Sequence, residues 1–313
     1  MQYRALGKSG LKLSAVGLGG WTTFGGSVNN PKIISDIINR AFESGINFFD
    51  IADIYAKGES EKAMGEVLRK FPRHELVITS KAFWPMSEDI NDRGLSRKHL
   101  IESCEKSLKR IGTDYLDLYF CHRYDEETPL EETIRAMDHL VNQGKILYWG
   151  TSEWTGEQMK AAHRICSDGG YHKPIVEQPQ YNLIVRDKFE NDVAGTVKQL
   201  GMGTVTWSPL GSGMLTGKYD NAKAEGRLQK IEWLKDTFMT EKNVERVKAM
   251  KLLSDHLQIS RAELALAWLL KKSAVSSVIL GVTSVEQLDL NLKALKVNLT
   301  DEVVKKLDSL FTN

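Results

Sequence analysis

The stretch "NFFDIADIY" (residues 47–55) starts as a short apolar strand and ends with two carboxylates and a tyrosine. A carboxylate at the end of an apolar strand is costly unless a positive charge meets it. This run belongs to a series of short apolar, β-branched or aromatic runs, and near-continuous runs of this kind are typical of parallel strands covered on both faces. The eight runs span residues 13–21, 46–53, 76–81, 115–122, 146–152, 175–182, 203–210 and 276–283.

Helical patterns lie between these runs. Residues 96–111 carry an apolar stripe at helical spacing, with Ser96 placed to cap the helix and Gly112 placed to end it. Thr128 and Glu131 predict a capping box at the start of the next helix. Further helices are expected at residues 31–44, 59–70, 155–167, 187–199, 241–257, 260–271, 284–295 and 300–311.

Eight strands alternating with helices predict a closed (β/α)₈ TIM barrel. The alternative is a pair of open α/β domains, but no Pro-, Ser- or Gly-rich linker divides the chain. We therefore expect one domain over residues 1–313. Residues 211–240 form a long loop after the seventh strand, and connections of that length are usually functional. Extra helices are expected towards the C-terminus.

The composition argues against several classes of partner. The 313 residues carry 42 Lys and Arg against 41 Asp and Glu, a formal net charge of +1, so binding to nucleic acid or to a membrane surface is not expected. No apolar run approaches the roughly 20 residues that span a bilayer, and the polar N-terminus does not resemble a signal peptide. Cys104, Cys121 and Cys166 are odd in number and widely spaced, which predicts free thiols and a reducing, cytoplasmic location.

Active sites of such barrels lie at the C-terminal ends of the strands. The residues that end the eight runs are rich in polar and ionisable groups. They are Trp21, Asp50 with Tyr55 close behind it, Lys81, His122, Ser152, Gln178, Trp207 with Ser208, and Gly281 with Thr283.

Asp50 and Lys81 end neighbouring strands, so an ion pair across the rim of the barrel is geometrically easy. A tyrosine has an ordinary pKa of about 10, and a lysine ammonium close to Tyr55 would lower it towards the value that a proton donor needs. The spacing thus predicts an Asp50–Lys81–Tyr55 relay. A Schiff-base aldolase that uses Lys81 is an alternative, but an ion pair with Asp50 would keep the amine charged and unreactive.

The sequence does not predict a metal site or a familiar phosphate-binding motif. Cys121 and His122 are adjacent, but strand alternation points them to opposite faces and no further ligand spacing follows. The other histidines, at 74, 99, 139, 163, 172 and 256, are expected at the surface. "GLGGWTTFGG" (17–26) lacks the third Gly of a dinucleotide fingerprint, and "SGMLTGKY" (212–219) lacks the first Gly and the final Ser or Thr of a P-loop.

These features together resemble the aldo-keto reductases. The likeness starts from "GINFFDIADIYAKGESEKAMG" (45–65), with Lys81 and His122 following the next strands, and it extends to "ILGVTSVEQLDLN" (279–291). Within that superfamily the chain is most similar to the branch that contains the β subunits of voltage-gated potassium channels. That likeness rests on "TPLEETIRAM" (128–137), "NQGKILYWGTSEW" (142–154), "TGKYD" (216–220) and "EWLKD" (232–236).

The resemblance implies an NADPH-dependent reductase of carbonyl compounds. Tyr55 would be the general acid, Lys81 would lower its pKa, Asp50 would pair with Lys81, and His122 would orient the carbonyl. The alternative is a channel-subunit-like module that binds NADPH and turns over little. A homotetramer is implied by analogy alone.

The resemblance also implies binding residues. Ser152 and Gln178 would hold the nicotinamide carboxamide, with Tyr181 or Trp207 against its ring. Ser208, Pro209, Leu210, Gly211 and Ser212 would cradle the pyrophosphate, and Lys218 and Arg227 would add positive charge. The remaining expected coenzyme contacts are Gly20, Trp21, Asp50, Gly281, Thr283, Gln287 and Asn291. The expected substrate contacts are Trp21, Tyr55, Trp84, His122, Tyr124 and Trp154.

Overall fold

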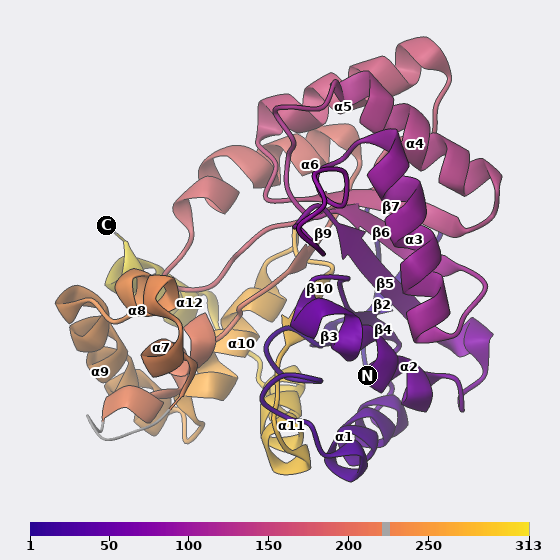
Figure 1. The fold of residues 1–313 in the computed structure, drawn as a ribbon. Helices are drawn as coiled ribbons and strands as arrows, with labels where there is room; N and C mark the ends of the chain where they lie inside the picture. The colour runs from indigo at the N-terminus through magenta and orange to yellow at the C-terminus, as the bar shows by residue number, and fades with distance from the viewer. Residues whose placement is uncertain (221–225, 313) are drawn as a thin grey trace.

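Eight parallel strands close into a barrel in the computed structural model, which describes residues 1–220 and 226–312 (Figure 1). The order around the barrel is β10-β3-β4-β5-β6-β7-β8-β9, and pairing of β10 with β3 closes it. The predicted TIM barrel is therefore confirmed. Its strands are β3 (Val16–Gly19), β4 (Phe48–Asp50), β5 (Val77–Ala82), β6 (Leu116–Cys121), β7 (Ile146–Ser152), β8 (Val176–Gln178), β9 (Gly203–Thr206) and β10 (Ser277–Leu280).

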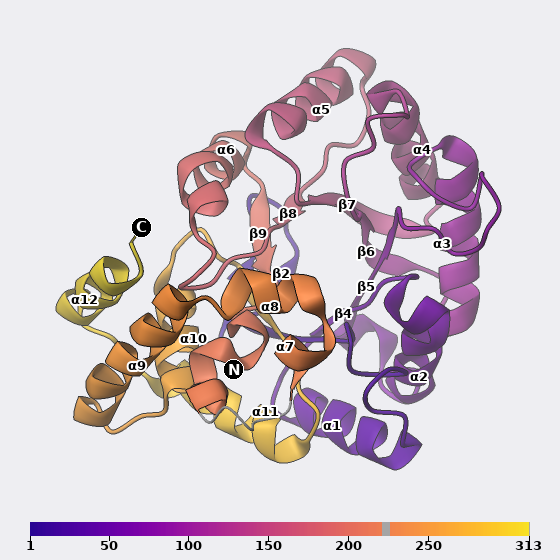
Figure 2. The ribbon, with the colours of Figure 1, turned by 60° about the vertical axis from the view of Figure 1, so that its left-hand side comes forward.

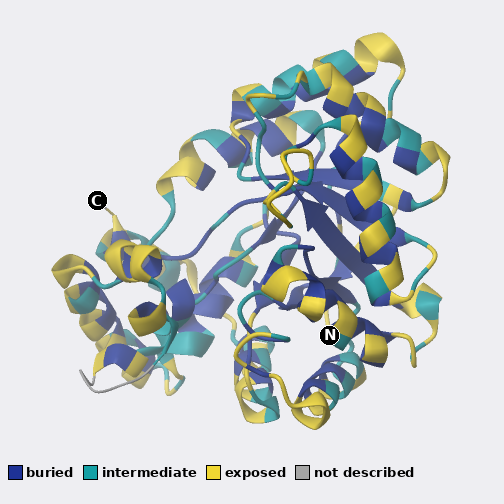
Figure 3. Ribbon diagram, in the orientation of Figure 1, coloured by how far each residue is buried: buried dark blue, intermediate teal, exposed yellow. Residues whose placement is uncertain are grey.

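Helices surround the strands as a ring (Figure 2). Their buried faces meet the sheet and their outer faces are exposed (Figure 3), as the amphipathic patterns predict. The ring consists of α1 (Pro31–Glu43), α2 (Glu59–Leu68), α3 (Arg97–Ile111), α4 (Leu130–Asn142), α5 (Gly156–Gly169), α6 (Ala194–Leu200), α10 (Arg261–Lys271) and α11 (Val285–Leu292). In the described part of the chain, no helix combines the length and the apolar character needed to cross a membrane.

The N-terminal hairpin differs from the prediction. Residues 13–21 were expected as one strand, but the chain breaks at Ala15 into β2 (Lys12–Ser14) and β3. β2 pairs antiparallel with β1 (Tyr3–Ala5) instead of joining the barrel. Leu6 and Leu13 have no exposed surface and pack with the apolar side chains of the barrel interior. The hairpin thus completes the core of the barrel.

The helix termini follow the predicted capping in one case and not in another. The Ser96 side chain accepts a hydrogen bond from the His99 amide at the start of α3, and Gly112 ends the helix with a φ of 75°. The capping box expected at Thr128 is wrong, because the Thr128 hydroxyl donates to Asp125 Oδ2 at 2.7 Å instead. Helix α4 begins after Pro129 with no side-chain cap.

The long connection after β9 is partly helical. It begins with two short 3₁₀ segments, Gly211–Thr216 and Lys218–Asp220, followed by α7 (Arg227–Lys230), α8 (Glu232–Phe238) and α9 (Glu241–His256) before α10. Leu228, Leu234 and Phe238 are buried, so the segment packs on the barrel through an apolar face. The chain ends with α12 (Asp301–Phe311).

Two of the histidines expected at the surface are buried. His99 is 1% exposed, its Nδ1 lies 3.6 Å from Asp92 Oδ1, and neither ring nitrogen has a hydrogen-bond partner among the described residues. His163 lies in α5, and its Nε2 is 3.1 Å from the Pro174 carbonyl oxygen. Both lie on the inner face of a ring helix, so their surface assignment was wrong.

Candidate active site

The predicted ion pair between Asp50 and Lys81 forms at the C-terminal ends of β4 and β5. Lys81 Nζ donates to Asp50 Oδ2 at 2.8 Å and to the Ile51 carbonyl oxygen at 2.7 Å. Lys81 has no exposed surface and Asp50 is 3% exposed. A buried ammonium with two short acceptors is held in one position.

The second oxygen of Asp50 is also satisfied. Its Oδ1 accepts from Thr79 Oγ1 at 3.1 Å and from Gln178 Nε2 at 2.9 Å. Gln178 ends β8, several strands away around the barrel. Asp50 therefore orients both the Lys81 ammonium and the Gln178 amide, and it links the two sides of the barrel mouth.

Tyr55 lies where the relay requires it. Lys81 Nζ donates to the Tyr55 hydroxyl at 3.3 Å. The turn that places Tyr55 is strained, because the next three residues, Ala56, Lys57 and Gly58, have φ values of 49°, 51° and 91°. Positive φ in two consecutive non-glycine residues costs energy, and such strain clusters at functional sites.

His122 follows β6 directly and joins the same group. Its ring lies edge-on to Tyr55, with ring centroids 5.8 Å apart. Its Nδ1 is buried without a hydrogen-bond partner among the described residues. Burial, Lys81 and Arg123 hold the pKa of His122 well below its ordinary value, so the imidazole is neutral. A neutral ring can donate one N–H to an acceptor in the mouth.

The pKa of Tyr55 differs from the expectation. Burial and the charge of Asp50 raise the pKa of Tyr55 well above its ordinary value, and Arg123 lowers it in part. The predicted lowering by Lys81 is therefore not seen. Tyr55 is fully protonated at neutral pH, which is the form that a proton donor needs.

The turn after β9 is rich in residues with positive φ. Ser208, Gly211, Ser212 and Gly213 have φ values of 55°, 54°, 54° and 94°. Successive residues of this kind turn backbone N–H groups to one side, where they can face an anion. The Ser212 hydroxyl is buried and has no partner within the described ranges. Pro209 and Leu210 complete the turn, with the Gly213 amide donating to the Leu210 carbonyl oxygen at 3.0 Å.

Arg227 reaches from the long connection to the end of the first barrel strand. Its Nη2 donates to Thr23 Oγ1 at 3.0 Å. It also approaches Gly281 so closely that a Cβ there would lie 3.1 Å from Nη2. Lys218 is exposed in the same connection. The structure therefore brings Arg227 to the rim between β3 and β10.

The residues expected at the adenosine end lie beside Arg227, after β10. Thr283 donates to Gln287 Oε1 from its amide at 2.9 Å and from its hydroxyl at 3.1 Å. Asn291 is one helical turn further along α11 and is nearly buried. Across the mouth, the Ser152 hydroxyl donates to the Gln178 carbonyl oxygen at 2.9 Å. Gly20 donates its amide to the Asp50 carbonyl oxygen at 2.9 Å, which fixes the loop after β3.

Aromatic side chains gather around the mouth. The Trp21 ring lies edge-on to Trp207 with centroids 5.7 Å apart, and Trp233 of α8 lies on its other side at 6.1 Å. Trp84 is partly exposed, and its ring centroid is 6.4 Å from that of His122. These four rings come from three connections, those after β3, β5 and β9, so the mouth has an apolar wall.

Two of the expected aromatic contacts do not line the mouth. Trp154 has no exposed surface and packs edge-on against Tyr124 at 4.9 Å, so it supports Tyr124 from behind. Tyr181 is buried among Phe189 and Trp268, outside the barrel, and its hydroxyl donates to a carboxylate. Trp154 and Tyr181 are therefore core residues. Of the two residues expected against the nicotinamide ring, Tyr181 and Trp207, only Trp207 faces the site.

Sequence reasoning missed three residues of the site. Glu153, with a φ of 60°, accepts hydrogen bonds from Trp207 Nε1 and Lys188 Nζ, each at 3.0 Å. Arg123 lies next to His122 at the rim. Trp233 belongs to the long connection, where no periodic signal exists. For Arg123 and Glu153 the signal was present, because each directly follows a predicted site residue at a strand end.

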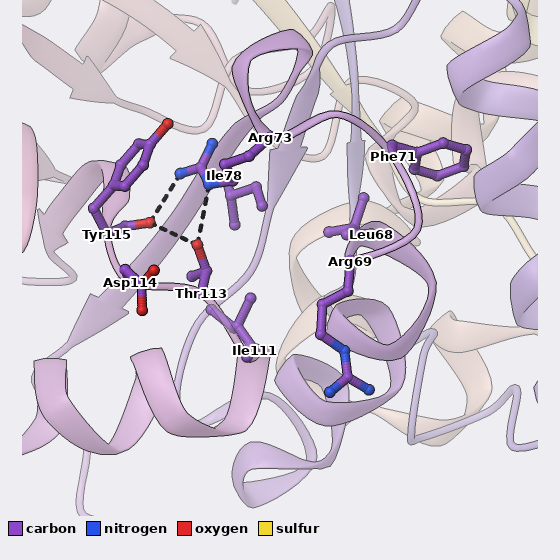
Figure 4. Close-up of a pocket in the computed structure, with 10 residues that line it drawn as sticks. Leu68, Arg69, Phe71, Arg73, Ile78, Ile111, Thr113, Asp114 and Tyr115 are labelled. Carbon is purple, nitrogen blue, oxygen red and sulfur yellow. Dashed lines mark hydrogen bonds between the residues drawn. The ribbon is translucent and has the colours of Figure 1, made fainter.

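A hollow lies at the end of the barrel opposite the candidate active site, and its arginine has a structural role. It lies beside the start of β5 and the end of α3 (Figure 4). Arg73 donates to Thr113 Oγ1 at 3.0 Å and to the Tyr115 carbonyl oxygen at 2.8 Å, and its guanidinium lies 3.8 Å from the Tyr115 ring centroid. The Arg73 guanidinium thus joins the loop before β5 to the loop before β6. Over residues 1–220 and 226–312, no group of three or more His, Cys, Asp or Glu could hold a metal ion.

The barrel carries a buried Asp–Lys pair, a tyrosine and a neutral histidine at the C-terminal ends of consecutive strands, together with a turn of positive-φ residues after β9. Such a set suits an oxidoreductase that acts on carbonyl groups. In agreement, the chain matches the aldo/keto reductase family over residues 15–311 and belongs to it. Members of this family generally use nicotinamide cofactors.

Proposed function

We propose that the protein reduces aldehydes or ketones to alcohols with NADPH, and that Tyr55 is the general acid. The observation that carries the proposal is the meeting of three groups at one mouth of the barrel. The Tyr55 hydroxyl accepts from the buried Lys81 ammonium at 3.3 Å, and His122 beside it keeps a buried nitrogen without a partner. A carbonyl oxygen placed between Tyr55 and His122 would accept hydrogen bonds from both.

The protein's own residues then supply the proton and stabilise the group that loses it. When bound, the reduced nicotinamide supplies a hydride for the carbonyl carbon. Negative charge develops on the carbonyl oxygen, and Tyr55 transfers its proton to that oxygen. An alkoxide is far more basic than a phenolate, so a raised pKa of Tyr55 does not prevent the transfer. Lys81 stabilises the resulting phenolate through the hydrogen bond it already makes.

The residues present fit a dinucleotide phosphate. The Gly211 and Gly213 amides donate within the turn at Ser208–Gly213, so its remaining backbone N–H groups and the Ser212 hydroxyl, which has no partner among the described residues, are the donors left for a pyrophosphate. Ser152 and Gln178 end the two strands before β9 in the barrel order, β7 and β8, and we expect them to hold the carboxamide. Arg227 supplies a cation beside Thr23 and Gly281, at the end of β10 where Thr283 follows, which favours NADPH over NADH because only NADPH carries a 2′-phosphate.

Turnover of a reactive aldehyde tests the role of Tyr55. The purified protein is given NADPH and 4-nitrobenzaldehyde, and loss of NADPH absorbance is followed. Tyr55→Phe should lower kcat by about 10²- to 10⁴-fold, while NADPH binding, measured by fluorescence titration, is retained. Tyr171→Phe, distant from the mouth, is the matched control. A wild-type protein without turnover, or a Tyr55→Phe variant with full turnover, would disprove the proposal.

Coenzyme choice gives a separate test at Arg227. Arg227→Met should raise KM for NADPH by about 10-fold or more, the value of a charge-assisted hydrogen bond, and should change KM for NADH much less. Arg164→Met, which removes a cation from the exposed face of α5, is the control. Equal effects on the two coenzymes would show that Arg227 does not recognise the 2′-phosphate.

The regulatory alternative, a channel-subunit-like module, has no specific observation in its favour. The likeness to that branch, the cytoplasmic location and a homotetramer stay predictions. All three cysteines are free and buried, which supports a reducing compartment.

A further inference from the structure

Arg123 is a cation at the catalytic mouth that the proposed reaction does not use. It follows His122 at the end of β6 and is half-buried. Its Nη1 donates to the His122 carbonyl oxygen and lies 3.5 Å from Ser152 Oγ, and its Cζ is 5.6 Å from the Trp84 ring centroid. The guanidinium is thus held between a strand end and an aromatic wall, beside the position proposed for the carbonyl.

The nearby carboxylates are engaged elsewhere. Asp125 accepts from the Leu95 amide and from Thr128 Oγ1, both at 2.7 Å. Glu153 accepts from Trp207 and from Lys188. Asp50 is paired with Lys81. Among the residues that the structure describes, no carboxylate lies within the 4.0 Å ion-pair distance of Arg123.

The charges at the mouth therefore do not balance. Lys81 is matched by Asp50, while His122 and Tyr55 are neutral at pH 7. Arg123 is left as a cation without an ion pair among the described residues. An unmatched charge that is partly withdrawn from water is unfavourable, so this position favours a ligand that brings a negative charge.

The phosphates of a dinucleotide are not placed to supply that charge. The turn proposed for the pyrophosphate follows β9, and Arg227 lies between β3 and β10. In the barrel order, β6 is three strands from β9 and four from β10, which is the opposite side. Arg123 therefore lies away from the phosphates, between Ser152 at the proposed nicotinamide end and the expected substrate contacts His122 and Trp84.

We infer that Arg123 is a specificity-determining residue that binds the carboxylate of acidic carbonyl substrates, namely oxo acids and aldehyde acids. The planar guanidinium has the donor geometry that matches a carboxylate. The Trp84 ring lies beside the guanidinium. Tyr55 and His122 would donate hydrogen bonds to the reacting carbonyl, which is a few atoms from the carboxylate in such a substrate. The inference rests on the proposed reductase function and adds the class of substrate to it.

A pair of substrates that differ only in charge provides the test. Wild-type kcat/KM is compared for 3- and 4-carboxybenzaldehyde and for their methyl esters, with NADPH as coenzyme. The acid should be preferred in at least one pair. Arg123→Met should lower kcat/KM for that acid by about 10- to 100-fold, the usual effect of losing a hydrogen bond to a charged group. The ester should lose much less, and Arg123→Lys should keep part of the preference.

Three outcomes would overturn the inference. One is that wild type reduces each acid no better than its ester, and a second is that Arg123→Met lowers both members of a pair equally. The third is that the variant weakens NADPH binding and leaves the acid-to-ester ratio intact, because the charge would then serve the coenzyme. Arg164→Met controls for the loss of net charge. Ester turnover that depends on Tyr55 separates these results from a failure of the proposed function.

Discussion

Replacing Lys81 by methionine removes the cation that meets Asp50 in the barrel interior. Asp50 is 3% exposed and would keep two neutral donors among the described residues, Thr79 at 3.1 Å and Gln178 at 2.9 Å. Removing one partner of a buried ion pair costs about 3–5 kcal/mol, because the other charge stays buried and uncompensated. We expect a loss of that size in the free energy of unfolding of Lys81→Met.

The same loss can be expressed as a melting temperature. With about 2.1 cal/mol/K of unfolding entropy per residue, the 313 residues have about 0.66 kcal/mol/K, so a loss of 3–5 kcal/mol lowers Tm by about 5–8 °C. Urea unfolding and calorimetry measure the two quantities. The control is Lys62→Met, which breaks a surface pair with Glu59 whose side chains are 53% and 56% exposed and should cost at most about 1 kcal/mol.

A double variant identifies the cause. If the loss comes from an uncompensated Asp50, then Asp50→Asn combined with Lys81→Met should be more stable than the sum of the two single losses predicts, by more than about 1 kcal/mol. The reasoning is refuted if Lys81→Met is no less stable than Lys62→Met, or if the two losses at the ion pair are simply additive.

Three further predictions concern the pH dependence and the packing of the fold. Because the pKa of Tyr55 is raised, kcat/KM for reduction should show no loss from Tyr55 deprotonation between about pH 7 and 9; a fall with a midpoint in that range would contradict the raised value. Burial raises the pKa of Asp53 from 3.8 to about 7, so its contribution to stability is present below pH 3.8 and is lost as pH rises to about 7. Between pH 5 and 8, the free energy of unfolding of wild type, measured with urea, should therefore fall by about 2–3 kcal/mol more than that of Asp53→Asn. Equal losses in the two proteins would disprove this prediction. Gly65→Ala would place a Cβ 2.3 Å from the Ile111 carbonyl oxygen and should cost at least about 1–3 kcal/mol, whereas Gly195→Ala, with open space in α6, should be neutral or stabilising; equal Tm values for the two would contradict the packing.

The site could be predicted from the sequence because a barrel brings strand ends together. Asp50, Lys81 and His122 end consecutive parallel strands, and the rule that these ends meet at one face placed them together without any distance information. The link from Asp50 to Gln178 could not be predicted, because it crosses the mouth between strands that are far apart in sequence. Pairing across a barrel depends on its tilt and closure, which a linear pattern does not contain.

Burial of single residues was the main source of wrong predictions. Trp154 and Trp84 are both tryptophans that follow strand ends, yet one is wholly buried and the other is 37% exposed. The break at Ala15 left only a weak sequence signal, because Ser14 precedes it but no Gly or Pro directly flanks it and the run continues with apolar residues. The hydrophobicity of Leu13 suits a barrel strand and a hairpin at the end of the barrel equally well, so it does not distinguish the two. Tertiary packing decides these cases, and residue type does not.

The expected effect of Lys81 on Tyr55 failed for an instructive reason. The prediction treated the ammonium as an isolated charge, but its nitrogen is 2.8 Å from an Asp50 oxygen, and Asp50 itself raises the pKa of Tyr55. At the Tyr55 hydroxyl the charges of Lys81 and Asp50 largely cancel, so burial has the largest effect on the pKa of Tyr55. In the proposed reaction the pair would therefore act after the proton has left Tyr55, when the hydrogen bond from Lys81 would stabilise the phenolate, and not before, when the phenol would have to be acidic in its own right. A buried relay of this kind works through the position of its proton donor and the basicity of the acceptor.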